Sequence, residues 1–431
     1  MKPEDKIIRD PLYGFIEFPS SISPILGALP LIRLTRIKQL AHTFLVYPSA
    51  VHSRFEHSIG VYHLAGLMAD RLNLSKEKKE IVQLAAVLHD IGHGPYSHPF
   101  EEVMMYVTQD ENFSHVDVTK LILEYDESLR NLLSDEKIRS IIEIYENRGQ
   151  SLESEIITGG IDADKLDYLR RDSYHTGVAY GIFDIERILR TLTPIEGGER
   201  KFLGVLEKGM YALESYRLAR YSMHTQVYEH KTRLITDDMF IRAVKLSIKE
   251  GILDPDSINP KKDPERFVRE YLKLDDYSIL HKILEVGDDK RSMSKDFVDR
   301  LLKRRLFKSA YSIYLNQHDV PNSLIREKLI KLNKKEVSEI EKKISNEAHI
   351  SQEDVILHVQ SSKIKLYEKL GEDEFLNDEK LLIKREKEVV AFDEITPFSL
   401  KQKTIRRLFV FCPEEYRGKV NEIAKSILGI E

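Results

Sequence analysis

The chain has 431 residues, of which 42% are hydrophobic and 32% charged, a soluble globular balance whose length predicts two or three structural units. Its formal net charge of -5 argues against nucleic acid as the main partner but allows a local basic pocket for phosphate groups. Cys412 is the only cysteine, which excludes a disulfide framework, and the lack of a membrane-length apolar run or a signal-peptide core predicts a cytoplasmic protein with no membrane partner.

The chain begins with two short strands, predicted within residues 6–18 around an Asp-Pro and Gly turn. From about residue 22 the pattern is helical for roughly 300 residues. Ser75 is expected to cap a helix that carries His89 and Asp90 and stops at Gly92. The other helices expected in this stretch cover residues 55–72, 98–108, 115–126, 134–146 and 205–250.

The composition changes after about residue 333. A charged segment at residues 334–343 precedes strand-like runs at residues 354–360, 388–393 and 407–412. We therefore expect a mainly α protein, with a helical domain over residues 1–330 and a smaller C-terminal α+β lobe over residues 331–431.

The most informative stretch is residues 84–98, where an apolar run delivers His89 and Asp90 side by side before Gly92, Gly94 and Pro95 interrupt the regular backbone. A carboxylate buried without a partner costs several kcal/mol or is neutralised. A divalent cation held by the His-Asp pair would remove that cost.

Two further residues extend this pair to a possible ligand set. His57, His89, Asp90 and Asp164 would offer one metal ion two imidazoles and two carboxylates, a set that suits Mn, Fe, Mg, Zn, Co or Ni. Each histidine taken singly is more often a hydrogen-bonded structural residue, but the order of all four in a helical domain favours a metal site. Asp164, Tyr168 and Asp172 share one helix face, which is either a solvated surface or a site for a cation or phosphate.

Several motifs in the chain resemble those of the HD-domain phosphohydrolases. In order they are Asp10-Pro11-x-x-Gly14, Arg36-Ile37-Lys38-Gln39-Leu40, Arg54-Phe55-Glu56-His57-Ser58-x-Gly60, Leu88-His89-Asp90-Ile91-Gly92-His93-Gly94-Pro95-Tyr96-Ser97-His98, Gly160-Ile161-Asp162-Ala163-Asp164-Lys165-Leu166-Asp167-Tyr168, Tyr228-Glu229-His230-Lys231 and Arg406-Arg407-Leu408-Phe409-Val410-Phe411-Cys412. More narrowly, the chain is similar to the deoxynucleoside triphosphate (dNTP) triphosphohydrolases of the SAM-and-HD-domain type. No separate SAM domain is expected ahead of these motifs.

The resemblance implies a dNTP triphosphohydrolase that releases a deoxynucleoside and inorganic triphosphate. One or two divalent ions would activate the water that attacks the α-phosphorus, and His57, His89, Asp90 and Asp164 would hold the metal. The positions that match the family's acid/base and supporting residues are His93, His98, Glu101 and His115. Among them His98 is expected to protonate the leaving 5′-oxygen while Glu101 orients it.

The resemblance also assigns substrate contacts. Positions that match triphosphate contacts are Arg54, Lys165, Tyr168 and Arg220, and positions that match the sugar pocket are Gln39, Leu40, Asp172 and Tyr228. A leucine against C2′ would exclude a ribose hydroxyl, which predicts deoxy over ribo substrates. Gly27, Ile32 and Thr35 stand where nucleotide-activated relatives read guanine, so a guanine-specific activator site is not expected.

Two other readings stay open. The protein could be a different HD hydrolase, such as a 5′-nucleotidase or a cyclic-nucleotide phosphodiesterase, for which fewer basic contacts suffice. It could also be a non-catalytic nucleotide sensor, although the intact metal positions and His98 argue against this. For the dNTP triphosphohydrolase a homo-oligomer, either a dimer or a tetramer, is expected.

Overall fold

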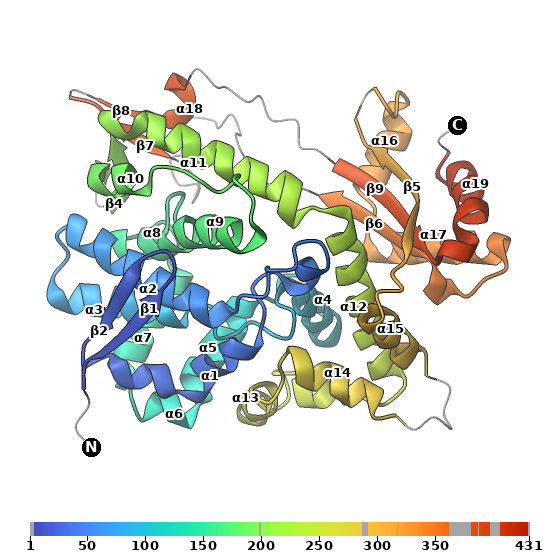
Figure 1. The fold of residues 1–431 in the computed structure, drawn as a ribbon, viewed down its shortest axis with the longest axis horizontal. Helices are drawn as coiled ribbons and strands as arrows, with labels where there is room; N and C mark the ends of the chain where they lie inside the picture. The colour runs from blue at the N-terminus through green and yellow to red at the C-terminus, as the bar shows by residue number, and fades with distance from the viewer. Residues whose placement is uncertain are drawn as a thin grey trace. The chain divides into compact units, whose positions relative to one another are not determined.

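The computed structural model describes residues 4–197, 200–286, 292–316, 318–361, 381–386, 388–396 and 406–429. The chain forms two compact units (Figure 1), the first from residues 1–229, 253–285 and 369–399 and the second from residues 230–252, 286–368 and 400–431. Each unit takes segments from both sides of residue 330. The predicted division into domains at residues 330 and 331 stays a prediction.

The first unit is largely helical. Its helices are α1 (Leu29–Arg33), α2 (Arg54–Arg71), α3 (Lys76–Leu88), α4 (His98–Thr108), α5 (His115–Tyr125), α6 (Glu127–Arg130), α7 (Asp135–Glu146), α8 (Leu152–Thr158), α9 (Ala163–Thr176), α10 (Ile185–Thr191), α11 (Met210–Met223), α13 (Pro264–Tyr271), α14 (Asp276–Leu284) and α18 (Phe392–Ile395). As predicted, the side chain of Ser75 caps α3 by accepting a hydrogen bond from the backbone of Lys78. Helix α2 is buried along most of its length and packs against α3 and α9, so it forms the centre of this unit.

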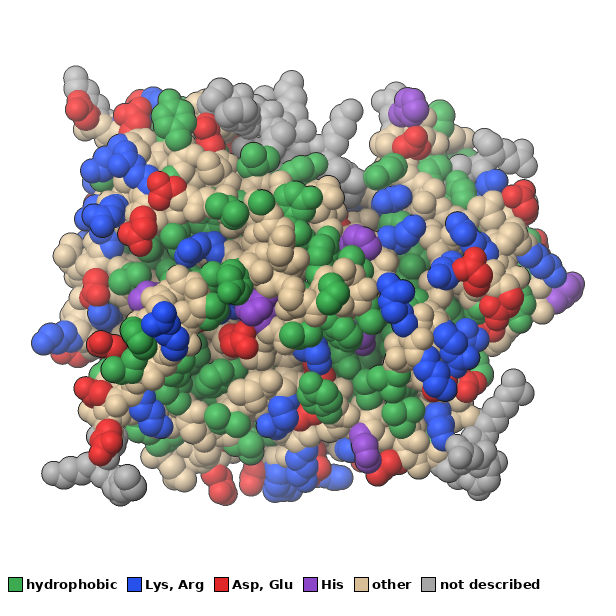
Figure 2. Space-filling view, viewed as in Figure 1, with side chains coloured by type: hydrophobic (Ala, Val, Ile, Leu, Met, Phe, Trp, Pro, Cys, Tyr) green, Lys and Arg blue, Asp and Glu red, His purple; other side chains and the backbone are tan. Residues whose placement is uncertain are grey.

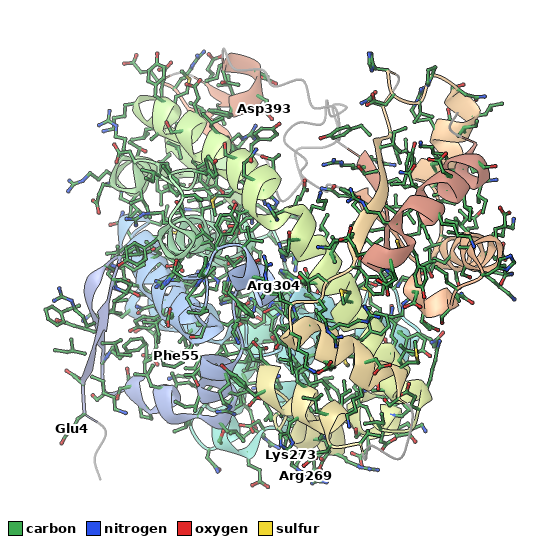
Figure 3. All side chains as sticks on the ribbon, turned by 45° about the vertical axis from the view of Figure 1, so that its right-hand side comes forward. Glu4, Phe55, Arg269, Lys273, Arg304 and Asp393 are labelled. Atoms are coloured by element: carbon green, nitrogen blue, oxygen red, sulfur yellow. The ribbon has the colours of Figure 1, made fainter. Side chains whose placement is uncertain are left out.

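Two small sheets accompany these helices. The hairpin of β1 (Lys6–Asp10) and β2 (Gly14–Phe18) confirms the predicted N-terminal strands. The second sheet has the order β3 (Leu192–Gly197), β4 (Arg200–Leu206), β7 (Leu382–Lys384) and β8 (Val389–Ala391). Asp393, labelled in Figure 3, follows β8 in α18 and forms an ion pair with Arg217 of α11.

The expectation of an unbroken helical stretch of roughly 300 residues was wrong. Strands β3 and β4 interrupt it, and β5 (Lys308–Tyr314) does so again in the second unit. Leu203 and Val205 of β4 are buried while its first two residues are exposed, which suits a strand packed on one face. Pro194 is compatible with β3 because this strand lies at the edge of its sheet.

The second unit is an α+β arrangement. Its antiparallel sheet has the order β5, β9 (Arg406–Cys412) and β6 (Ile356–Ser361), and its helices are α12 (Lys231–Lys249), α15 (Met293–Leu302), α16 (Ser323–Ile330), α17 (Lys334–Ala348) and α19 (Arg417–Leu428). Alternate residues of β9, namely Leu408, Val410 and Cys412, join a core with buried residues of α17 and α19. The mainly α fold with a strand-containing C-terminal lobe is confirmed, and residues 362–380 and 397–405 of that predicted lobe lie outside the described residues.

Irregular helical turns connect several of these elements. A π-helical turn spans His224–Tyr228 after α11, and 3-10 turns cover Ser23–Gly27, Leu34–Arg36, Ala41–Leu45, Glu207–Gly209, Pro255–Ile258, Gln352–Asp354 and Glu414–Tyr416. None of the helices in the described ranges is long and apolar enough to cross a membrane. Figure 2 shows basic and acidic side chains interspersed over the visible face.

Candidate metal centre and active site

The first turn of helix α2 supplies two residues of the candidate site, Arg54 and His57. The side chain of Ser53 accepts a hydrogen bond from the backbone of Glu56 and so sets the helix start at Arg54, with Phe55, labelled in Figure 3, in the same turn. Arg54 and His57 lie one turn apart on the same side of the helix. Both are buried, at 3% and 1% exposure, so both need polar partners.

Helix α3 delivers His89 and Asp90 to the same place. The helix ends at Leu88, not at Gly92 as predicted, and His89 follows its last turn. There His89 Nδ1 donates to the carbonyl oxygen of Ala86 at 2.7 Å and satisfies one of the free carbonyls of that turn. This bond places the proton on Nδ1 and leaves the lone pair on Nε2, which is buried without a hydrogen-bond partner.

The loop after Asp90 is held tightly by distant parts of the first unit. A Cβ on Gly92 would lie 2.0 Å from the backbone oxygen of His115, so only glycine permits this close approach of α5. The hydroxyl of Tyr271 donates to the carbonyl of Gly92 at 2.8 Å, and the fully buried Arg33 reaches the carbonyl of Ile91 at 3.3 Å. Residues from α1 and α13 therefore support the turn that follows the His-Asp pair.

The end of the same loop has an unusual backbone. Tyr96 and Ser97 have φ angles of 58° and 66°, a left-handed conformation that costs a non-glycine residue about 1–3 kcal/mol. The buried carboxylate of Asp276 accepts from the backbone of Tyr96 at 2.6 Å and from that of Lys38 at 3.0 Å. Asp276, in the first turn of α14, thus holds a strained turn directly before His98.

The ligating atoms of His57, His89 and Asp90 lie within 4.8 Å of one another, and Asp164 approaches the two histidines. His57 Nε2 is 3.0 Å from Asp164 Oδ1 and 3.8 Å from Asp90 Oδ2, and His89 Nε2 is 3.1 Å from Asp90 Oδ1 and 3.8 Å from Asp164 Oδ1. Atoms that share one cation at bond lengths of about 2.0–2.2 Å are spaced about 3 Å apart or somewhat more. Together with the unpartnered Nε2 of His89, these spacings fit a divalent cation, and two imidazoles with two carboxylates leave its identity open.

Asp164 comes from the first turn of α9. Asp162 caps this helix by accepting from the backbone of Lys165 at 2.7 Å, which places Asp164 on the side facing His57. The ammonium group of Lys165 bonds to Asp162 Oδ2 at 2.6 Å and to the carbonyl of Gly159 at 3.1 Å. Burial raises the pKa of Asp162 to about 6 despite the opposing charge of Lys165. Lys165 therefore lies next to the candidate ligand Asp164, and its ammonium group is paired with Asp162 and the carbonyl of Gly159.

Charges around the centre are balanced by close pairs. Asp90 Oδ2 accepts from Arg54 Nη1 at 2.6 Å, and although burial alone would raise the pKa of Asp90, Arg54 and the neighbouring histidines hold it well below its usual value. Burial alone would lower the pKa of His57, but its hydrogen bonds to Asp164 and Asp167 outweigh burial and raise it to about 10. A proton on His57 Nε2 and a cation would compete for the same position.

A second cluster contains the four predicted catalytic residues, whose ligating atoms lie within 4.8 Å of one another: His93, His98, Glu101 and His115. Glu101 Oε1 is 2.5 Å from His115 Nδ1 and 3.5 Å from both His93 Nδ1 and His98 Nδ1. Burial lowers the pKa of His93 well below its usual value, and Arg54 adds to this effect. His98 is the accessible member, with a side chain 59% exposed.

The predicted sugar-pocket residues gather around a buried carboxylate. Asp172 Oδ2 accepts from the hydroxyl of Tyr228 at 2.7 Å, and Asp172 Oδ1 accepts from His52 Nε2 at 2.8 Å. The backbone of Gln39 donates to the carbonyl of His52 at 3.0 Å, and Leu40, which follows it, is 4% exposed. The π-helical turn places Tyr228 next to α9. The structure therefore joins Tyr228 and His52 to Asp172, and it joins the backbone of Gln39 to that of His52.

Tyr168 connects this group with the metal residues. It lies one turn after Asp164 and one turn before Asp172 on α9. Its ring is 6.0 Å from that of Tyr228 in an edge-to-face arrangement. Burial raises the pKa of Tyr168, and the positive charge of Arg220 opposes this rise.

Sequence reasoning missed two residues of the site. Asp167 bonds to His57 Nδ1 at 2.8 Å, and His52 bonds to Asp172. Asp167 lies three residues after Asp164, so helical spacing alone would have placed both carboxylates on one face of α9. No signal in the sequence distinguished His52 from the other histidines, because its partner is 120 residues away.

The HD-domain family matches residues 54–172, and the family described as the HD-associated region matches residues 183–431. The chain is 30% identical to the uncharacterized protein MJ1154 of Methanocaldococcus jannaschii, over 98% of this chain and 84% of that protein. It is also 30% identical to the deoxynucleoside triphosphate triphosphohydrolase SAMHD1 homolog of Dictyostelium discoideum, over 71% of this chain but only 60% of the relative.

A solved structure supports the same relationship. The crystal structure of a phosphohydrolase from Bacteroides thetaiotaomicron superposes with a TM-score of 0.74 at 25% identity, covering 95% of this chain and all of that one. The two family matches together span most of the sequence, and the second alone covers more than half of it. The chain therefore belongs to the HD-domain phosphohydrolases that carry the HD-associated region.

Proposed function

We propose that the protein is a metal-dependent dNTP triphosphohydrolase that cleaves its substrate into a deoxynucleoside and inorganic triphosphate. The observation that carries this proposal is the cluster of His57, His89 and Asp90, whose ligating atoms lie within 4.8 Å of one another, with Asp164 Oδ1 3.0 Å from His57 Nε2 and 3.8 Å from His89 Nε2. Similarity to relatives named as deoxynucleoside triphosphate triphosphohydrolases supports the choice of substrate.

The four converging residues would hold one divalent ion, and a second ion could bind beside it. A bound ion, whether Mn, Mg, Fe, Zn, Ni or Co, would supply an activated water and polarise a phosphoryl oxygen. His98 is assigned the proton donor to the leaving 5′-oxygen because it is the most accessible residue of its cluster. Glu101, whose Oε1 lies 2.5 Å from His115 Nδ1, would orient the imidazoles of His93, His98 and His115 and could accept a proton from them.

We assign the substrate contacts in two groups, one for the triphosphate and one for the sugar. We assign the triphosphate to Arg54, Lys165, Tyr168 and Arg220, and the sugar to Gln39, Leu40, Asp172 and Tyr228. Asp172 accepts from Tyr228 and His52, and each carboxylate oxygen keeps capacity for a further donor such as a sugar hydroxyl.

One observation favours a second candidate, an HD hydrolase of nucleoside monophosphates or cyclic nucleotides. Arg54 and Lys165 are both paired with carboxylates of the protein, Asp90 and Asp162. A triphosphate would have to compete for these cations, whereas a single phosphate group needs fewer of them.

Product analysis separates the two candidates. Purified protein is incubated with panels of dNTPs, NTPs, nucleoside monophosphates and cyclic nucleotides in Mn²⁺ or Mg²⁺, and the products are resolved by ion exchange. Inorganic triphosphate and a deoxynucleoside are expected. Release of orthophosphate from a monophosphate, or opening of a cyclic nucleotide to a monophosphate, with dNTPs left intact, would reject the proposal in favour of the second candidate. Light scattering on the same sample tests the predicted homo-oligomer.

A further inference from the structure

Behind His57, on the side opposite the converging ligand atoms, lies a buried chain of charged side chains. His57 Nδ1 bonds to Asp167 Oδ2 at 2.8 Å. Arg171 binds both oxygens of Asp167, through Nε at 2.8 Å and Nη2 at 2.9 Å, and its Nη1 is 2.9 Å from Asp10 Oδ2. His57, Asp167, Arg171 and Asp10 are each at most 4% exposed.

The backbone of α2 is shaped to admit this chain. A Cβ on Gly60 would lie 2.0 Å from Asp167 Oδ1 and 2.4 Å from Arg171 Nη2. Gly60 has no unusual backbone angle that would require glycine. Its small size therefore serves the close approach of the Asp167–Arg171 pair to α2, one turn after His57.

We propose that Asp167 is a positioning residue that fixes the tautomer and the direction of His57 toward a divalent cation, with Arg171 and Asp10 holding Asp167 in place. An ionised carboxylate only accepts hydrogen bonds, so Asp167 requires a proton on His57 Nδ1 and directs Nε2 toward Asp90 and Asp164. This inference rests on the metal site of the proposed function, but not on its substrate.

The number of charged groups around Asp167 supports a positioning role and not only a packing role. Asp167 and Asp10 place two carboxylates against the single guanidinium of Arg171, so this row of charged side chains keeps surplus negative charge beside the His57 imidazole. A carboxylate on the remote nitrogen of a ligating histidine raises the basicity of that ligand, and loss of such a partner typically weakens metal affinity 10–100-fold. Asp10 also accepts from the backbone of Leu12 and Tyr13, which ties the chain to the N-terminal hairpin.

The test is Mn²⁺ binding by the full chain with Asp167→Asn, which removes one charge and nearly preserves shape. Free Mn²⁺ is followed by its EPR signal during titration, and we expect a Kd 10–100-fold above that of the unchanged protein. Asp126→Asn is the matched control, because Asp126 is a buried helix cap of α6 that asparagine can replace. Its Kd should stay within twofold. The d–d absorption bands of bound Co²⁺ should shift in Asp167→Asn only.

A second variant guards against misfolding. Gly60→Ala keeps every charge but displaces the Asp167 carboxylate, and it should weaken Mn²⁺ binding in the same way while far-ultraviolet circular dichroism stays unchanged. An unaltered Kd in a folded Asp167→Asn or Gly60→Ala variant would overturn the inference. Protein that binds Mn²⁺ with the expected differences but hydrolyses no dNTP would support it while rejecting the proposed function.

Discussion

The two metal-facing carboxylates should respond very differently to replacement by alanine. Asp90 is 2% exposed and lies 2.6 Å from the buried guanidinium of Arg54, whereas the side chain of Asp164 is 33% exposed. Asp90→Ala leaves the charge of Arg54 buried without its partner. Removing one member of a buried ion pair costs about 3–5 kcal/mol, while a partly exposed pair such as that of Asp164 contributes about 1 kcal/mol or less.

Against a typical total stability of about 5–15 kcal/mol, the loss at Asp90 is a large fraction and that at Asp164 a small one. Replacing Arg54 with methionine in the Asp90→Ala background removes the orphaned charge and should restore most of the lost stability. Neither Asp90→Ala nor Asp164→Ala should retain stoichiometric metal, because each removes a ligand carboxylate. Metal loss and stability loss are thereby separated.

Urea unfolding of EDTA-treated protein measures the free energy of unfolding without bound metal. Hydrogen exchange of residues 84–100 then shows whether the loss of stability lies in the first unit. Addition of Mn²⁺ at about 100 times its Kd should stabilise the unchanged protein by about 2.7 kcal/mol and both alanine variants by far less. Equal urea midpoints for Asp90→Ala and Asp164→Ala would refute the buried-pair argument. Full metal occupancy in Asp90→Ala would reject Asp90 as a ligand.

Three further outcomes are expected. Leu40→Ala should lower the ratio of dATP to ATP turnover, about 10-fold in kcat/KM, because a wider pocket no longer excludes the 2′-hydroxyl; an unchanged ratio would count against a sugar gate. Burial, together with the neighbouring His52, lowers the pKa of His175 to about 4. Between about pH 6.5 and 4 the unfolded chain therefore binds a proton at His175 that the folded chain does not. The free energy of unfolding should fall by up to about 1.4 kcal/mol per pH unit as the pH decreases through this range. His175→Gln should flatten this slope in urea unfolding followed across that range, and equal slopes would contradict the assignment. Asp276→Ala should lower kcat while Mn²⁺ titration gives an unchanged Kd, since it releases the Tyr96 turn but not the metal ligands; loss of Mn²⁺ binding would show that the turn does more than position His98.

Much of the helical unit could be predicted because its elements have local signals. Ser75 and the apolar periodicity after it located α3, and the Asp-Pro and Gly turn located the first hairpin. The proposed metal ligands were predicted from the order of residue types and from the family resemblance. The structure groups the ligating atoms of His57, His89 and Asp90 and places Asp164 near both histidines, and their role as ligands stays a prediction. Their roles in catalysis and substrate binding stay predictions.

The features that the sequence did not predict depend on partners far away in the sequence, which one sequence alone does not reveal. Strand β4 pairs in parallel with β7, more than 170 residues later, so its strand character depends on a distant segment. The end of α3 was misplaced because the side chain of His89 bonds to Ala86 and substitutes for a further helical turn. The bond of His52 to Asp172 is equally non-local.

The supports of the His-Asp loop have a practical meaning for dissecting the protein. The hydroxyl of Tyr271, the carboxylate of Asp276 and the guanidinium of Arg33 reach the loop from outside residues 54–172, which match the HD domain. A fragment trimmed to those matched residues would keep all four metal-facing side chains yet lose the scaffolding that shapes the segment between them. The conformation of the His-Asp loop therefore depends on residues from across the first unit, so activity assays should use the full chain and not an excised HD-domain fragment.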